Sequence, residues 1–111
     1  MDGPSKVEVW LTDLKGRGHE QKQERPGIIW RDLDHVKMAI AIPCTSAQDK
    51  TKYPYTYLIS PTTKNGLSED SVALVFQLTS VDKTRLIRKL GELDAEDISG
   101  IGPILKEMLR I

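Results

Sequence analysis

The sequence predicts an α+β fold, in which a small and mainly antiparallel β-sheet is followed by one C-terminal helix. Three observations carry this prediction. Short segments in which apolar and polar residues alternate, as in half-buried strands, recur through the first half of the chain. A nearly continuous apolar run over residues 72–78 indicates a strand that is buried on both faces. Near the C-terminus the apolar residues change to helical spacing, at Ile98, Ile101, Leu105, Met108 and Leu109.

The segments between these patterns are polar and favour loops. Residues 15–24 contain no apolar side chain, residues 45–54 are polar, and Asn65-Gly66 is a turn signal. Pro26 opens the second strand, and Pro43 is expected to end the third, because proline has no N–H for a strand ladder. The predicted strands cover residues 7–12, 27–30, 36–42, 55–59, 72–78 and 85–90, with a turn at 32–35.

The sequence predicts where the terminal helix starts and leaves two alternatives for its course at Pro103. Asp94 is a plausible N-cap, because its short side chain can accept a hydrogen bond from a backbone N–H in the first turn. Gly100, Gly102 and Pro103 interrupt the pattern. Pro103 either kinks one helix or occupies the first turn of a second short helix, where proline is favoured.

Composition limits the function classes. With 111 residues, the chain is expected to form a single domain, residues 1–111. It contains no apolar run of about 20 residues, no signal-peptide pattern and only one cysteine, so we expect a cytoplasmic protein without a membrane span. The formal net charge is zero, but residues 15–31 carry five basic and two acidic side chains. This segment either faces phosphates or is an ordinary solvated surface.

Three stretches, in order, resemble the MazF/PemK family of RNA-cleaving toxins. The first is a strand ending in Asp13-Leu14, followed by Gly18-His19-Glu20-Gln21 and then Arg25-Pro26. The second is Ile42-Pro43-Cys44-Thr45-Ser46, followed by Tyr53-Pro54-Tyr55. The third is residues 70–77, running on to Val81-Asp82-Lys83. Each piece alone is weak, whereas the three in order are fairly specific.

The resemblance implies a fold, a reaction and partners. It implies an SH3-like β-barrel with a C-terminal helix and a homodimer with an RNA groove shaped by both protomers. It implies cleavage of single-stranded RNA at short sequences by attack of the ribose 2′-OH, without metal or other cofactor. It also implies a cognate antitoxin with an acidic, disordered tail that would fold in the groove. Two histidines and one cysteine likewise form no metal-ligand cluster in the sequence.

Four residues match catalytic positions of the family. Arg25 would stabilise the charged phosphorane through its planar fork of donors, and Thr45 would position the 2′-OH or a phosphate oxygen. His19 can carry a proton near neutral pH, and Glu20 would orient a neighbour or act as base. Without the resemblance, each has an ordinary interpretation: a surface arginine, a turn threonine, a loop histidine and an exposed glutamate.

Four further residues are candidates for RNA binding. Ser46 and Gln77 occupy family positions, Lys22 adds charge to the first loop, and Tyr55 could stack on a base. Tyr53, Tyr55 and Tyr57 alternate, however, which is also typical of half-buried strand residues.

The chain departs from the family at several positions. PemK-type members have a carboxylate where Phe76 stands and an arginine where Leu74 stands, so their proposed base–acid pair cannot operate here. Thr79, Lys22 and Gln23 also differ from common family residues. Two alternatives therefore stay open. One is a toxin on the same scaffold that binds DNA gyrase, although the helix end lacks the expected aromatic residue; the other is a relative that has lost activity.

Overall fold

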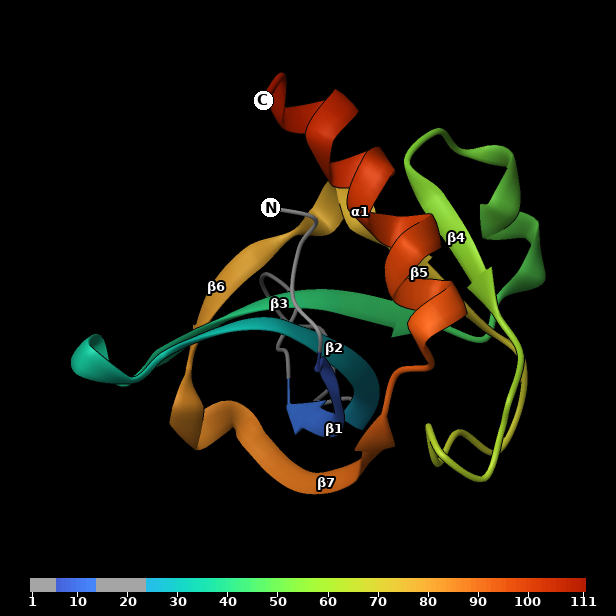
Figure 1. Ribbon diagram of the computed structural model, residues 1–111. Coiled ribbons are helices and arrows are strands. Elements are labelled where there is room, and N and C mark those ends of the chain that lie inside the picture. The colour runs from blue at the N-terminus through green and yellow to red at the C-terminus, as the bar shows by residue number, and fades with distance from the viewer. Residues whose placement is uncertain (1–5, 14–23) are drawn as a thin grey trace, which may run out of the picture.

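The computed structural model describes residues 6–13 and 24–111. These residues form a seven-stranded sheet and one C-terminal helix, which confirms the predicted fold class (Figure 1). The elements are β1 (Glu8–Asp13), β2 (Glu24–Leu33), β3 (Met38–Thr45), β4 (Thr56–Ile59), β5 (Ser71–Leu74), β6 (Thr79–Asp82), β7 (Leu86–Glu92) and α1 (Ala95–Leu109). Short 3₁₀ helices lie between them: η1 (Asp34–Val36), η2 (Gln48–Lys52), η3 (Val75–Gln77) and η4 (Lys83–Arg85).

Strand β3 lies at the centre of the sheet. The strand order is β4-β5-β3-β2-β1-β7, and every pair is antiparallel. One edge of β3 pairs with β2, while the other is divided between two partners. Residues 38–41 pair with β6, and Cys44 and Thr45 pair with β5. Strands β5 and β6, which precede and follow η3 in the chain, are therefore both fixed against one strand.

The sheet is closed by a loop rather than by a strand pair. Within the described residues, β4 and β7 are the two ends of the hydrogen-bonded path, so the SH3-like barrel expected from the resemblance is not closed by strands. Instead, the loop between β4 and β5 packs against β7. The Glu92 N–H donates to the Lys64 carbonyl over 2.9 Å, and a Cβ on Gly91 would lie 2.2 Å from that oxygen. The curled sheet thus approaches a barrel.

Several predicted boundaries are corrected. Pro43 does not end β3; it faces Gly27 and lies between the segments that pair with β6 and β5, where neither partner strand's register includes it. Val36 is in η1 and is 65% exposed, so β3 begins later than predicted. The apolar run 72–78 is a strand only as far as Leu74, after which η3 turns the chain toward β6.

Helix α1 starts after Asp94, as predicted, and continues through Pro103 to Leu109. The alternative in which Pro103 begins a second short helix is therefore wrong. Ile98, Ile101 and Leu105 are buried in a core that also contains residues of the sheet, whereas Leu109 is 49% exposed and lies outside it. No helix among residues 6–13 and 24–111 combines the length and apolar character that a membrane span requires.

The helix approaches β4 closely at one glycine. A Cβ on Gly100 would lie 2.3 Å from the ring of Tyr57, whose hydroxyl donates to Asp97 over 2.9 Å. Burial and this carboxylate raise the pKa of Tyr57 to about 12. The glycine that interrupts the helix pattern in the sequence is therefore the residue that lets α1 pack closely on β4.

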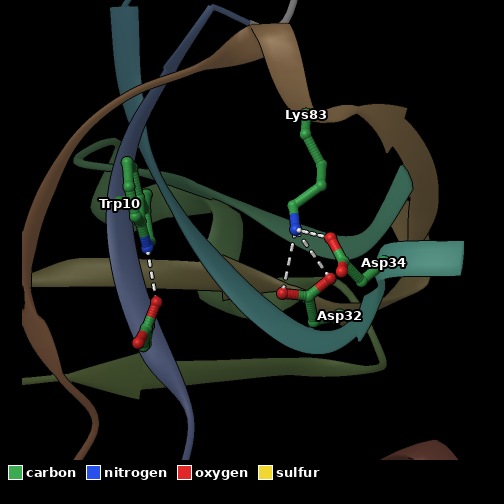
Figure 2. A network of polar contacts seen from close by, with 5 residues as sticks. Trp10, Asp32, Asp34 and Lys83 are labelled. Atoms are coloured by element: carbon green, nitrogen blue, oxygen red, sulfur yellow. Dashed lines mark hydrogen bonds and ion pairs between the residues drawn. The ribbon is translucent and has the colours of Figure 1, made fainter. Parts of the chain in front are cut away.

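Polar contacts hold the long β2–β3 hairpin at its tip. Lys83 Nζ, from η4, bonds to both carboxylate oxygens of Asp32 at 2.9 and 3.0 Å and to Asp34 at 3.0 Å (Figure 2). Figure 2 also shows Trp10 Nε1 donating to a carboxylate; this is Glu8, over 2.8 Å. The hydrogen bonds to Asp32 and Asp34 raise the pKa of Lys83. These contacts fix the hairpin far from the helix.

The two helical glycines should respond oppositely to alanine. Gly102→Ala should raise the free energy of unfolding by at most about 0.5–1 kcal/mol, because alanine favours helix and, apart from the adjacent residues and the helix backbone, no atom lies within 4 Å of the added Cβ. Gly100→Ala should lower it by about 1–3 kcal/mol, because the methyl group overlaps Tyr57. Urea unfolding of both variants measures the difference. Equal effects would mean that Gly100 is not a packing requirement.

Candidate functional site

A cavity of about 620 Å³ lies where the loop closes the sheet. Its walls come from the beginning of β2, the end of β3, the β4–β5 loop and the middle of β7. It is lined by Leu11, Glu24, Arg25, Pro26, Cys44, Thr45, Ser46, Gly66, Leu67, Ser68, Glu69, Ser71, Arg88 and Leu90. Arg25, Thr45 and Ser46, three of the candidates chosen from the sequence, are therefore brought to one site.

The backbone of Arg25 is fixed by its contacts with β1. It pairs with Thr12 of β1, and the buried hydroxyl of Thr12 donates to the Arg25 carbonyl over 2.8 Å. Gly27 allows this approach, because a Cβ there would lie 2.9 Å from the Thr12 methyl group. The arginine is thus carried by a strand, although the sequence predicted that β2 would begin only at residue 27.

Thr45 and Ser46 stand opposite the start of β2. The last pair of the β2–β3 register is Gly27 with Pro43, and Arg25 and Thr45 each lie two residues beyond it. The Thr45 hydroxyl accepts from the Ala47 N–H over 3.2 Å, which turns the chain at the strand end. The chain therefore turns at Thr45, and the same residue lines the cavity.

The facing wall depends on Asn65. Its side chain is fully buried, and its Oδ1 accepts from the N–H groups of Thr62 and Leu67, each over 3.0 Å. Its Nδ2 donates to the Ser60 carbonyl over 2.9 Å. Gly66 follows with φ +70°, and a Cβ there would lie 2.0 Å from the Leu90 carbonyl. This turn places residues 66–69 along the cavity.

Sequence reasoning missed three charged residues of the cavity. Arg88 extends from β7, where it pairs with Leu11, and adds a second guanidinium to the site. Glu24 and Glu69 add two carboxylates. The predicted strand 85–90 contained Arg88, but only the pairing of β7 with β1, which also pairs with β2, brings it to the side of the sheet where Arg25 lies.

Cys44 lines the cavity but is 1% exposed. Burial raises the pKa of its thiol to about 12. Because the thiolate is the reactive form, Cys44 is a packing residue of the cavity floor rather than a nucleophile at neutral pH.

The remaining candidates lie elsewhere. His19, Glu20 and Lys22 fall outside the described residues. Tyr55 and Gln77 are described and exposed, but neither lines the cavity. Tyr55 has φ +60° just before β4. In the described part of the chain, no group of three or more His, Cys, Asp or Glu side chains is placed to hold a metal ion.

Comparisons with known proteins identify a family and related structures. A family model for PemK-like, MazF-like toxins of type II toxin-antitoxin systems matches residues 5–109. Endoribonuclease MazF9 of Mycobacterium tuberculosis is 30% identical over 109 residues, covering 89% of this chain and 90% of MazF9. The crystal structure of MazF (Form-I) from Deinococcus radiodurans has a TM-score of 0.71 and 25% identity, and the match covers 98% of this chain and 96% of that one.

Asn65→Ala should lower the free energy of unfolding by about 2–4 kcal/mol, because it leaves buried N–H and C=O groups of the loop without partners. Lys64→Ala is the matched control, since the Lys64 contact to Glu92 is made by its backbone carbonyl. Urea unfolding compares the two. A loss no greater for Asn65→Ala than for the control would contradict the role of the amide.

Cys44 should contribute a pH-dependent difference in stability. The folded thiol keeps its proton up to about pH 12, whereas the unfolded thiol loses it near its ordinary pKa of 9.0. The stability that wild type holds over Cys44→Ala should therefore be constant below pH 9 and decrease as the pH rises above it. Unfolding curves of both proteins at pH 8, 9.5 and 10.5 measure this. A difference that does not change with pH would show that burial leaves the thiol's pKa unshifted.

Proposed function

The chain belongs to the family of PemK-like, MazF-like toxins of type II toxin-antitoxin systems, and from this we propose that it is an endoribonuclease that cuts single-stranded RNA in the cavity around Arg25. One observation carries the proposal. Arg25 is distant in sequence from Thr45 and Ser46, all three match family positions, and they line one cavity together with a second arginine, Arg88. The relative MazF9 is named an endoribonuclease, which supports the same activity here.

The proposed reaction is a transesterification. The ribose 2′-oxygen forms a bond to the adjacent phosphorus, and the bond from phosphorus to the 5′-oxygen breaks. The 2′-OH proton passes to a base, and an acid protonates the leaving 5′-oxygen. The products are a 2′,3′-cyclic phosphate and a 5′-OH. These steps require a base, an acid and groups that stabilise the phosphorane, so we propose that no metal ion takes part.

The cavity residues suit separate roles. Guanidinium groups offer several N–H donors to phosphate oxygens and stay charged at neutral pH. We assign phosphorane stabilisation chiefly to Arg25, with Arg88 holding a neighbouring phosphate. The hydroxyls of Thr45 and Ser46 would orient the 2′-OH or a phosphate oxygen.

Proton transfer has several candidates. Glu24 and Glu69 line the cavity, and we propose their carboxylates as candidates for the base. His19 and Glu20 belong to the segment that directly precedes Glu24 in sequence and remain proposed assistants from the family match. We propose Gln77, Lys22 and Tyr55 as contacts to the RNA beyond the cavity.

The proposal extends to assembly and partners. Family membership implies an antitoxin, and we propose that its acidic, disordered tail competes with RNA for the cavity arginines. We further propose that residues 1–111 form one domain that works as a homodimer in the cytoplasm.

Arg25→Ala should reduce RNA cleavage by at least about 100-fold, because it removes charged donors from the developing phosphorane. Cut sites and end groups should be mapped on RNA of varied sequence in the presence of EDTA. Wild type should produce 5′-OH and 2′,3′-cyclic phosphate ends, and Arg25→Lys should recover only part of the activity.

Arg31→Ala is the control, because Arg31 is an exposed arginine of the same strand that does not line the cavity. It should cleave like wild type. Intact RNA with folded wild-type protein would overturn the proposal, and cleavage that disappears in EDTA would overturn its metal-free mechanism.

A further inference from the structure

Aromatic and basic side chains form an exposed patch beside the cavity. Tyr53 and Phe76 are 44% and 42% exposed, and their ring centroids lie 6.1 Å apart with the planes tilted by 52°. The Nζ atoms of Lys50 and Lys52 lie 5.4 and 5.8 Å from the centre of the Tyr53 ring. We call these four residues the stacking patch. Large aromatic rings kept at the surface with cations around them are not explained by the packing of the core.

The backbone beneath the stacking patch is well fixed. The Tyr53 N–H donates to the Lys50 carbonyl over 3.1 Å at the end of η2, and the following Pro54 restricts Tyr53 to its extended conformation. The Thr56 hydroxyl donates to the Tyr53 carbonyl over 2.9 Å. From the other side, the Phe76 N–H donates to the Tyr55 carbonyl over 3.2 Å. The rings are therefore prearranged, which lowers the entropy cost of binding.

The stacking patch continues from the cavity along two chain segments. Ser46 lines the cavity, and η2 begins two residues later. Ser71 also lines the cavity, and β5 leads from it to Phe76. At ~3.3 Å per strand residue, Ser71 and Phe76 are on the order of 15 Å apart. An RNA segment of a few nucleotides held in the cavity can therefore reach the patch.

We propose that Tyr53, Phe76, Lys50 and Lys52 form a base-stacking subsite for single-stranded RNA next to the cavity, a proposal that rests on the proposed ribonuclease function. Aromatic rings stack on bases of any identity, and ammonium groups neutralise the phosphates between them. Asp49 is the one acidic residue of η2, against two lysines. This excess of positive charge favours a polyanion over an apolar partner.

The test uses RNA that cannot be cut. Once cut sites are mapped, an oligonucleotide with a 2′-deoxy sugar at the cut position carries 2-aminopurine at each flanking position in turn. With wild type and with Tyr53→Phe, stacking on the patch should quench the 2-aminopurine fluorescence when the probe is at one of these positions. Tyr53→Leu should lose this quenching and bind at least about fivefold more weakly, and Phe76→Leu should weaken binding similarly.

The lysines have their own readout. Replacing Lys50 and Lys52 by alanine should reduce the slope of log affinity against log salt by about 1.4, the value for two phosphate contacts on a single strand. Val36→Ala and Lys106→Ala are matched controls, at the hairpin tip and on α1, and should leave affinity and slope unchanged. Figure 1 shows η2 and the hairpin tip on opposite sides of the molecule.

The outcomes separate this inference from the function on which it rests. If Tyr53→Leu and Phe76→Leu bind RNA like wild type while Arg25→Ala still abolishes cleavage, the subsite is overturned and the ribonuclease stands. If those variants keep RNA affinity and lose affinity for the antitoxin, the patch is a protein-docking surface and the RNA subsite is again overturned. If folded wild type neither cuts nor binds RNA, both proposals fail.

Discussion

The contact between the β4–β5 loop and β7 is the constraint on which the rest of the structure depends. The strand path ends at β4 on one side and at β7 on the other, and the loop spans the opening between them. The contact is possible because Gly66 and Gly91 have no Cβ, and it is stable because the Asn65 side chain satisfies buried backbone groups of the loop. A buried amide with all these partners fixes one loop conformation.

This closure also creates the cavity. A barrel closed by strand pairing would fill the opening with backbone hydrogen bonds, whereas a loop spans it and leaves room for a ligand. The two arginines illustrate the effect. Arg25 is set by the buried hydroxyl of Thr12 on the β1–β2 side, and Arg88 is on β7, which the loop contacts. Because strands carry both cations, their separation is defined by the sheet rather than by a loop, as a preorganised anion site requires.

The sequence predicts those features that depend on local patterns. Alternation and helical spacing identify most strands and α1, and the Asn65-Gly66 signal correctly indicates a turn. The predicted strand ends are wrong where contacts between residues distant in sequence determine the structure. Pro43 remains in β3 because the partners on that edge change beside it, and the chain turns after Leu74 because Thr79, at the start of β6, pairs with Ala41 of β3. The family match identifies Arg25, Thr45 and Ser46 for the site, but Arg88 joins them only through the pairing of β7 with β1, and Glu69 only through the fold of the β4–β5 loop.

The neutral overall charge is compatible with RNA as a substrate because the proposed contacts are local. A formal net charge of zero gives weak long-range attraction for a polyanion, so nonspecific retention on RNA is small. Affinity must then come from a few short-range interactions: two guanidinium groups in the cavity, and rings and ammonium groups in the stacking patch. The proposed enzyme would select RNA segments that can enter the cavity and unstack a base at the same time. On this proposal, selectivity for exposed single strands rests on the short-range contacts of the cavity and the stacking patch.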